Sequence, residues 1–288
     1  MKVAIASGKG GTGKTTIAVN LASLIVKNSK QVCYADCDVE EPNGHLFLNP
    51  IIDRQWPAVI PIPVVDEKLC DACGKCKDIC EFSAITVIVD KVLVFPELCH
   101  GCGGCELVCP PKAITESPRE IGVVMIGHKG NLQYVSGKLN IGEPSAAPVI
   151  RDVKKAFAEY QDVIIDAPPG TACPMVETVS DADYVFLVTE PTPFGLNDLS
   201  LAVETVRKLD IPYSVIINRA GSGDNKVQEY CQRENIPITA EIPDDRRIAE
   251  SYSKGKIIYE ALPEYKIYFE NIINEITKWQ KNIERVTK

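Results

Sequence analysis

Two cysteine runs with the same spacing constrain what this 288-residue chain can fold into more than any other feature. Each run reads C-x2-C-x2-C-x3-C, and the second repeats the first 29 positions later. The runs are Cys70, Cys73, Cys76, Cys80 and Cys99, Cys102, Cys105, Cys109. Neighbouring residues repeat with them, since Gly74 corresponds to Gly103 and Ala84 to Ala113. This spacing is typical of thiolates that surround a [4Fe–4S] cube.

In two-cluster ferredoxins the fourth ligand of each cube comes from the other run, so the spacing predicts two [4Fe–4S] clusters. The predicted ligand sets are Cys70, Cys73, Cys76, Cys109 for the first cluster and Cys99, Cys102, Cys105, Cys80 for the second. Zinc is the alternative metal for paired C-x2-C motifs, but the repeated four-cysteine run is more typical of iron–sulfur proteins. The second run ends in Cys109-Pro110, as ferredoxin runs do, whereas the first ends in Cys80-Glu81.

A second motif lies near the N-terminus, where the apolar stretch Lys2–Ser7 predicts a buried strand and Gly8–Thr15 reads G-K-G-G-T-G-K-T. Glycines leave backbone N–H groups free to converge on phosphate oxygens, and the following helix adds its dipole. Lys14 is expected to neutralise phosphate charge and the Thr15 hydroxyl to bind Mg²⁺. The predicted ATP-binding residues here are Gly8, Gly10, Gly11, Thr12, Gly13, Lys14, Thr15 and Thr16.

The string Lys-Gly-Gly-Thr-Gly-Lys-Thr, which begins at Lys9, resembles the deviant Walker A motif of MinD/ParA-type P-loop ATPases. That family includes the Mrp-type iron–sulfur carriers and the nitrogenase iron protein. The resemblance covers nearly all of the chain outside the cysteine-rich segment. It implies a homodimer that sandwiches nucleotide, in which Lys9 reaches the phosphates bound by the partner subunit.

Other segments fit the same resemblance. Asp36-Cys37-Asp38 resembles the family's switch I, which implies that Asp38 activates the attacking water and Asp36 supports Mg²⁺. Asp166 matches the Walker B aspartate that holds Mg²⁺, and Gly170 lies in a segment that resembles switch II. The positions that resemble the family's adenine contacts are Asn218 and Pro243. The implied catalytic residues are Lys9, Lys14 and Asp38.

Strand-like and helical stretches alternate outside residues 60–117, which predicts an α/β fold: a mostly parallel P-loop sheet flanked by helices. Crowded turns and the cysteine runs predict that 60–117 is an inserted small α+β ferredoxin-like domain, with β pairs at Ala84–Val89 and Lys91–Phe95. The expected domains are therefore 1–59 and 118–288 for the ATPase and 60–117 for the insertion. An apolar stripe in the C-terminal helix is expected to dock on the sheet rather than on a membrane.

The composition bears on which partners the chain can bind and in which cellular compartment it is expected. A net charge of −8 and a pI near 5.1 argue against broad nucleic-acid binding, which needs a surplus of Lys and Arg. Nothing resembles a signal peptide, and no stretch approaches the ~18 apolar residues of a membrane span. A cytoplasmic location is therefore expected, where clustered thiols serve as metal ligands or catalytic groups rather than disulfides.

Four cysteines lie outside the runs. Cys33 and Cys231 are expected to be core residues, and Cys37 lies between the switch I aspartates. Cys173 follows Asp166 by seven positions, an offset that resembles the cluster-binding cysteine of the nitrogenase iron protein. A cluster shared between two subunits is one interpretation of Cys173, and packing of a buried thiol is the favoured one.

The two motifs together predict an iron–sulfur ATPase that binds ATP and Mg²⁺ and couples dimer closure to electron transfer or metallocofactor maturation on a partner protein. One alternative is a carrier that donates whole iron–sulfur clusters. Another is a MinD-like positioning ATPase in which the ferredoxin domain is only a docking surface.

Overall fold

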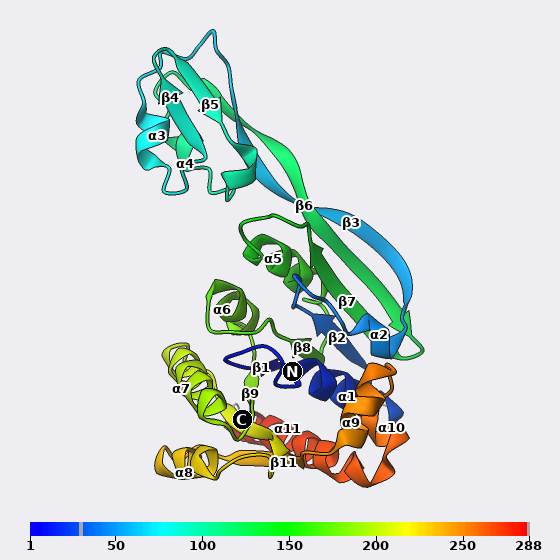
Figure 1. Ribbon diagram of the computed structural model, residues 1–288. Coiled ribbons are helices and arrows are strands. Elements are labelled where there is room, and N and C mark those ends of the chain that lie inside the picture. The colour runs from blue at the N-terminus through cyan, green and yellow to red at the C-terminus, as the bar shows by residue number, and fades with distance from the viewer. Residues whose placement is uncertain (29–30, 287–288) are drawn as a thin grey trace.

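The structure is a computed structural model that describes residues 1–28 and 31–286 of the chain. Within these residues, nine strands form one sheet in the order β11-β10-β9-β1-β8-β2-β7-β6-β3 (Figure 1). The strands are β1 (Lys2–Ala6), β2 (Val32–Asp36), β3 (Ile51–Val65), β6 (Ile114–Lys129), β7 (Leu132–Leu139), β8 (Val163–Asp166), β9 (Tyr184–Thr189), β10 (Tyr213–Ala220) and β11 (Ile238–Pro243). Neighbouring strands are parallel except at β7–β6 and β6–β3. The expected α/β fold with a mostly parallel sheet is therefore present.

Helices cover both faces of this sheet, so the central strands are buried on both sides. One face packs against α1 (Lys14–Lys27), α10 (Ile258–Ala261) and α11 (Lys266–Val286). The other packs against α5 (Ala147–Ala156), α6 (Cys173–Val179), α7 (Pro193–Lys208) and α8 (Lys226–Arg233). Two further helices, α2 (His45–Leu48) and α9 (Arg246–Ser253), lie side by side near α1, and the short 3₁₀ helix η2 (Pro263–Tyr265) precedes α11 (Figure 1).

The C-terminal helix docks on the protein's own sheet, as its apolar stripe predicts. Phe269, Ile272 and Ile276 are buried in the core that α1 shares, and Trp279 packs against Tyr184 with ring centroids 5.5 Å apart. Among the helices of residues 1–28 and 31–286, none is both long and apolar enough to cross a membrane.

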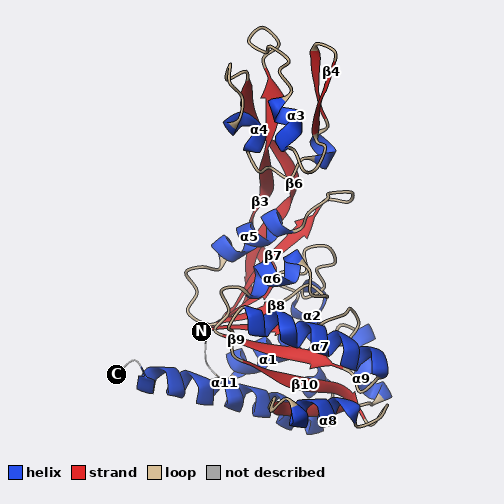
Figure 2. Ribbon diagram, turned by 90° about the vertical axis from the view of Figure 1, so that its left-hand side faces the viewer, coloured by secondary structure: helices blue, strands red, loops and turns tan. Residues whose placement is uncertain are grey.

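Strands β3 and β6 form a ribbon that continues beyond the sheet and carries an outlying module (Figures 1 and 2). Their pairing runs from Ile51 with His128 to Val65 with Ile114. β3 is the edge strand of the sheet and contains three prolines. A proline cannot donate a hydrogen bond to a neighbouring strand, and an edge strand tolerates this because one of its sides has no neighbour to accept one. We call this ribbon the arm. Both predicted domain boundaries, after residue 59 and after residue 117, fall inside these strands, whose pairing continues past both positions with a register shift between Ala58 and Val59.

The module at the end of the arm, residues 66–113, consists of short elements and turns: α3 (Lys75–Ile79), β4 (Ile85–Ile88), β5 (Lys91–Val94), the 3₁₀ helix η1 (Pro96–Leu98) and α4 (Gly104–Leu107). The expected β pair is present as β4 and β5. The repeat seen in the sequence recurs in the backbone, since positive φ angles occur at three pairs of positions 29 residues apart: Ala72 and Gly101, Gly74 and Gly103, Ser83 and Lys112. The two halves of the module therefore share one local fold.

The geometry of the arm predicts that the module is dispensable for folding of the body. Because Val65 and Ile114 are paired in antiparallel register, an Asn-Gly turn that replaces residues 66–113 should close the ribbon as a two-residue hairpin. We expect this shortened chain to unfold cooperatively, with a Tm within about 5 °C of the intact protein. Calorimetry checks this, and loss of a cooperative transition would show that the body needs the module.

Candidate functional site

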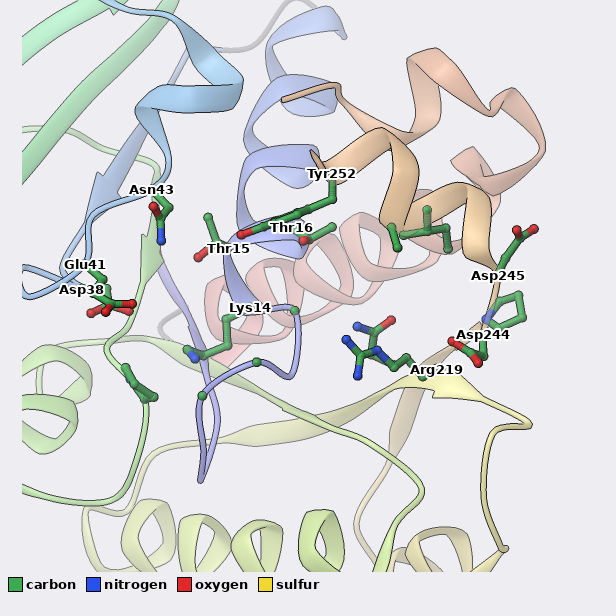
Figure 3. A pocket seen from close by; sticks show the side chains of 18 residues that line it. Lys14, Thr15, Thr16, Asp38, Glu41, Asn43, Arg219, Asp244, Asp245 and Tyr252 are labelled. Atoms are coloured by element: carbon green, nitrogen blue, oxygen red, sulfur yellow. The ribbon is translucent and has the colours of Figure 1, made fainter. Parts of the chain in front are cut away.

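A cleft of about 430 Å³ opens where the glycine-rich loop joins β1 to α1, and Figure 3 shows the side chains that line it. Gly13 caps α1 with φ of 94°, a left-handed backbone conformation that favours glycine. The lining residues are Gly10, Gly11, Gly13, Lys14, Thr15, Thr16, Asp38, Glu41, Asn43, Pro169, Asn218, Arg219, Pro243, Asp244, Asp245, Ile248, Ala249 and Tyr252. The fold thus brings most of the predicted loop residues into one cleft at the N-terminus of α1, an arrangement suited to an anion.

Lys14 is the cation at the phosphate-binding end of this cleft. Its side chain is 6% exposed, and burial lowers its pKa, while the negative charges of Asp166 and Asp38 act in the opposite direction. A bound phosphate would add further negative charge beside the ammonium group and favour its charged form.

Two aspartates lie side by side beneath the cleft because β2 and β8 are adjacent parallel strands that pair Asp36 with Asp166. The Tyr34 hydroxyl donates to Asp166 Oδ2 at 2.9 Å, and the Gly44 N–H donates to Asp36 Oδ2 at 2.9 Å. Asp166 Oδ1 is buried without a hydrogen-bond partner. Burial, and then the charge of Asp166, raise the pKa of Asp36 well above its usual range, and burial raises the pKa of Asp166 to about 6.

These carboxylates fit a hard divalent cation. Mg²⁺ prefers oxygen ligands and is commonly held by one or two carboxylates together with waters and phosphates. The unpartnered Asp166 Oδ1 provides such an oxygen, and the Thr15 hydroxyl lies nearby in the cleft. Neither Asp36 nor Asp166 lines the cleft itself, since both are buried beneath it.

Asp38 lies at the end of the cleft formed by the segment after β2, together with Glu41 and Asn43 (Figure 3). Burial, and then the neighbouring Asp166, raise the pKa of Asp38 to about 6. A carboxylate with a pKa near neutrality is well matched to accept a proton from water.

Lys9 does not line the cleft but is held by its own chain. Lys9 Nζ lies 3.3 Å from Glu190 Oε2, and Arg219 binds the other oxygen of the same carboxylate at 2.7 Å. Glu190 is 7% exposed, so its charge is compensated by these two cations rather than by water. No local pattern predicts this contact, because Glu190 is 181 positions from Lys9.

The far end of the cleft is built by the C-terminal ends of β10 and β11. Asn218 of β10 and Pro243 of β11 line it, and the Asn218 Nδ2 group donates to the Thr12 carbonyl oxygen at 2.8 Å, which ties β10 to the glycine-rich loop. Arg219 and one face of α9 also line the cleft and were missed by the sequence reasoning. The apolar and polar positions of α9 recur at helical spacing, so the sequence predicts an amphipathic helix there. That pattern does not indicate that the helix contacts a ligand.

Six of the predicted nucleotide-site residues lie outside the lining: Lys9, Asp36 and Asp166, described above, and Gly8, Thr12 and Gly170. Gly8 packs against the backbone of Asp198, Thr12 is buried, and the Gly170 N–H donates to the Ser7 carbonyl oxygen at 3.0 Å. The switch II segment still reaches the cleft through Pro169, which precedes Gly170.

In the module, each predicted set of four cysteines lines its own small cavity. Cys70, Cys73, Cys76 and Cys109 line one, and Cys80, Cys99, Cys102 and Cys105 line the other. Each set therefore combines three cysteines of one run with the last cysteine of the other, in the crossed pattern that the sequence predicts.

Backbone donors face these sulfurs in a repeated pattern. The N–H groups of Ala72 and Gly101 donate to Cys70 and Cys99 Sγ at 3.4 and 3.5 Å, and those of Ala84 and Ala113 donate to Cys80 and Cys109 Sγ at 3.3 Å. Such donors stabilise thiolates and tune the potentials of iron–sulfur clusters.

Each cavity is lined by four thiols, the number and kind of ligand that an iron–sulfur cube takes. Among the described residues, no three cysteine, histidine or carboxylate side chains converge closely enough to hold a single metal ion. A cube binds its four thiolates on four separate irons. Burial raises the pKa of Cys105 to about 11, so a thiolate there needs a compensating positive charge such as iron.

The cysteines outside the runs differ in exposure. Cys33, Cys37 and Cys231 are buried, as expected for the first and third. Cys173 is exposed at the start of α6, so the packing interpretation favoured from the sequence is wrong. Its place in the first turn of α6 puts it at the surface rather than in the core.

Comparison with known proteins agrees with the interpretation of the cleft as a nucleotide-binding site. The family model for the CobQ/CobB/MinD/ParA nucleotide binding domain matches residues 3–258. An uncharacterized protein of Methanocaldococcus jannaschii is 34% identical over 285 residues, covering 97% of each chain. A protein of Pyrococcus horikoshii named iron-sulfur cluster carrier protein is 24% identical over 286 residues, which cover 93% of this chain and 83% of that protein.

Among solved structures, the septum site-determining protein MinD complexed with Mg-ADP, also from Pyrococcus horikoshii, matches with a TM-score of 0.60 at 19% identity. The match covers 96% of this chain and 95% of that structure. At this identity the likeness concerns the fold.

The contact between Tyr34 and Asp166 generates a prediction about Mg²⁺. In a Tyr34→Phe variant the Asp166 carboxylate loses a donor, so its pKa rises further and it holds a cation less well. We expect the Mg²⁺ concentration for half-maximal ATP turnover to rise roughly tenfold. Because the carboxylate must be ionised, turnover that falls below about pH 6 in the intact protein should start to fall at a higher pH in the variant.

Tyr134→Phe is the matched control, because Tyr134 stacks on Tyr34 with ring centroids 6.0 Å apart but is not hydrogen-bonded to Asp166. Equal Mg²⁺ dependence in the two variants would contradict a positioning role for the Tyr34 hydroxyl.

Proposed function

The chain belongs to the CobQ/CobB/MinD/ParA nucleotide-binding domain family, and from that premise we propose that it is an iron–sulfur P-loop ATPase. In this proposal, ATP binding and hydrolysis are coupled to electron transfer or to metallocofactor maturation on a partner protein. One observation carries it: both four-cysteine cavities lie at the end of an arm whose strand β3 follows directly on the segment that lines the ATP cleft.

The cleft supplies the groups that ATP hydrolysis needs. The N–H groups of the glycine-rich loop and Lys14 bind the phosphates, and Asp38 accepts the proton of the attacking water. Thr15 and Asp166 hold Mg²⁺, supported by Asp36, and the ion neutralises charge on the phosphate oxygens when bound. Asn218 and Pro243 line the cleft, and the residues that follow them, Arg219 and Asp244, lie at the end opposite Asp38 (Figure 3), where the adenine base belongs.

The module supplies the redox groups. Cys70, Cys73, Cys76 and Cys109 hold one [4Fe–4S] cluster, and Cys99, Cys102, Cys105 and Cys80 hold the other. The crossed lining of the two cavities and the N–H donors on the sulfurs support this assignment.

A homodimer is part of the proposal, and in it Lys9 contacts the nucleotide bound by the second copy. The contact between Lys9 and Glu190 holds the ammonium group within its own chain. The phosphates of a nucleotide bound by a second copy offer a stronger anion, so closure of the dimer exchanges one partner of Lys9 for another.

The relatives named iron-sulfur cluster carrier protein favour a second candidate, a carrier that donates whole clusters. Four thiolates per cluster, held in a compact module, favour retention of the clusters instead. Incubation with an apo-acceptor protein distinguishes the two, because a carrier loses iron to the acceptor whereas an electron donor keeps it.

The proposal predicts that ATP turnover depends on the redox state of the module. Anaerobic turnover should differ severalfold between dithionite-reduced and oxidised protein, with iron counted on the same samples. The chain in which an Asn-Gly turn replaces residues 66–113 is the control, and its rate should not respond to reductant. A rate in the intact protein that ignores redox state, with its iron retained, would support a positioning ATPase with a structural docking module.

The cluster assignment predicts an iron content of about eight atoms per chain, and about four after loss of one cluster. Cys76→Ala and Cys102→Ala should each lose one cluster, and different ones, as seen by iron analysis and electron paramagnetic resonance. Cys173→Ser is the control, because this exposed thiol lies outside both cavities, and it should keep all of the iron. Stoichiometric zinc, or unchanged iron in both alanine variants, would contradict the assignment.

A further inference from the structure

One face of α9 forms a wall of the ATP cleft. Asp245, Ile248, Ala249 and Tyr252 all line the cleft and lie at positions i, i+3, i+4 and i+7, which share one side of a helix. Asp245 caps the helix by accepting from the Arg247 N–H at 2.8 Å, so this wall has a fixed start.

Tyr252 stands in the middle of the cleft. In Figure 3 its ring lies across the cleft beside Thr15 and Thr16, between the Asp38 end and the end where Asp244 and Asp245 lie. The side chain is 41% exposed, a large fraction for an aromatic ring that lines a cleft. A ligand that extends from the glycine-rich loop to the far end of the cleft must pass this ring and cover it.

The other side of the Tyr252 ring contacts α2. Its centroid lies 4.9 Å from that of Phe47, which is 4% exposed, and the two rings are tilted by 47°. A second contact lies one turn further along, where a side chain at Gly255 would come within 2.7 Å of the Leu46 carbonyl oxygen. The end of α9 is therefore packed closely against α2 at two points.

Helix α2 connects the cleft to the arm. It follows the segment that contributes Asp38, Glu41 and Asn43 to the cleft, and only Asn49 and Pro50 separate it from β3. A displacement of Phe47 therefore acts on the first residues of β3. These residues lie at the end of the arm opposite the module (Figure 1).

We propose that Tyr252 is a nucleotide-contacting residue, covering the sugar and first phosphate of the bound nucleotide. Its ring contact with Phe47 passes the presence of that nucleotide to α2 and the root of the arm. A ligand shifts a conformation only through contacts that differ between its states, and the Tyr252 ring makes such a contact because its exposed part is covered only when the cleft is occupied. This inference rests on the proposed function, since it assumes that the cleft binds ATP and ADP.

The test measures ADP affinity by calorimetry, and amide exchange of residues 45–52 with and without ADP, on the full chain with its iron. Tyr252→Ala should weaken ADP binding about tenfold, as expected for loss of an aromatic contact, and remove the ADP-dependent protection of residues 45–52. Phe47→Leu should bind ADP within about twofold of the intact protein yet lose that protection. Tyr230→Ala, a tyrosine of α8 outside the cleft, is the matched control and should change neither measurement.

The outcomes separate this inference from the proposed function. If the intact protein does not bind ADP, the proposed function fails. If the intact protein binds ADP and both Tyr252→Ala and Tyr252→Leu bind it equally well, Tyr252 is not a nucleotide contact. If Phe47→Leu keeps the full ADP-dependent protection of residues 45–52, the ring pair does not carry the signal. Thermal unfolding of each variant identifies any that do not fold, and Tyr252→Leu then replaces Tyr252→Ala.

Discussion

Two carboxylates buried side by side, Asp36 and Asp166, impose the constraint on which the rest of the site depends. Parallel pairing of β2 and β8 places them opposite each other, and burial raises the pKa of both. Their neighbours are arranged to limit this cost: Gly44 and Tyr34 each donate to one of them, and Lys14 stands in the cleft above. One oxygen of Asp166 is left without a partner, so the site is built to be completed by a cation. The nucleotide cleft is thus the place where unfavourable buried charge is compensated by a ligand.

The arm extends this site outward. Because β3 starts two residues after α2, the segment that carries Asp38 and the ribbon that carries the module are nearly continuous along the chain. Antiparallel pairing from Ile51 to Val65, with register shifts after Ile52 and after Ala58, joins the two strands of the ribbon along their length, which a flexible linker lacks. Prolines in β3 are tolerated because the strand lies at the edge of the sheet. The cleft and the cysteine cavities are therefore connected by paired strands rather than by a flexible linker.

The sequence predicted the elements whose signals are local. The glycine-rich loop, the strand ending at Asp166 and the crossed cysteine sets follow from local patterns. The structure places most of the loop residues in one cleft, Asp166 buried beneath it, and the cysteines in two cavities. The missed features involve contacts between distant segments. Tyr34 is an ordinary strand residue until its hydroxyl is seen on Asp166, and Tyr252 is an ordinary helix residue until its ring is seen in the cleft. The contact of Lys9 with Glu190 and the exposure of Cys173 are of the same kind.

By itself, the sequence determined which ligands the chain was predicted to bind, because the motifs typical of phosphate and iron–sulfur sites are short runs of glycine, lysine and cysteine that lie close together in the chain. It also determined the alternation of strands and helices, because apolar periodicity is a local property. Only the tertiary structure decided where these chemistries lie relative to each other. The pairing of β3 with β6 places the cysteines at the end of an arm, and the packing of α9 on α2 places Tyr252 between the cleft and that arm. Both depend on side chains far apart in the chain, whose meeting no local pattern encodes.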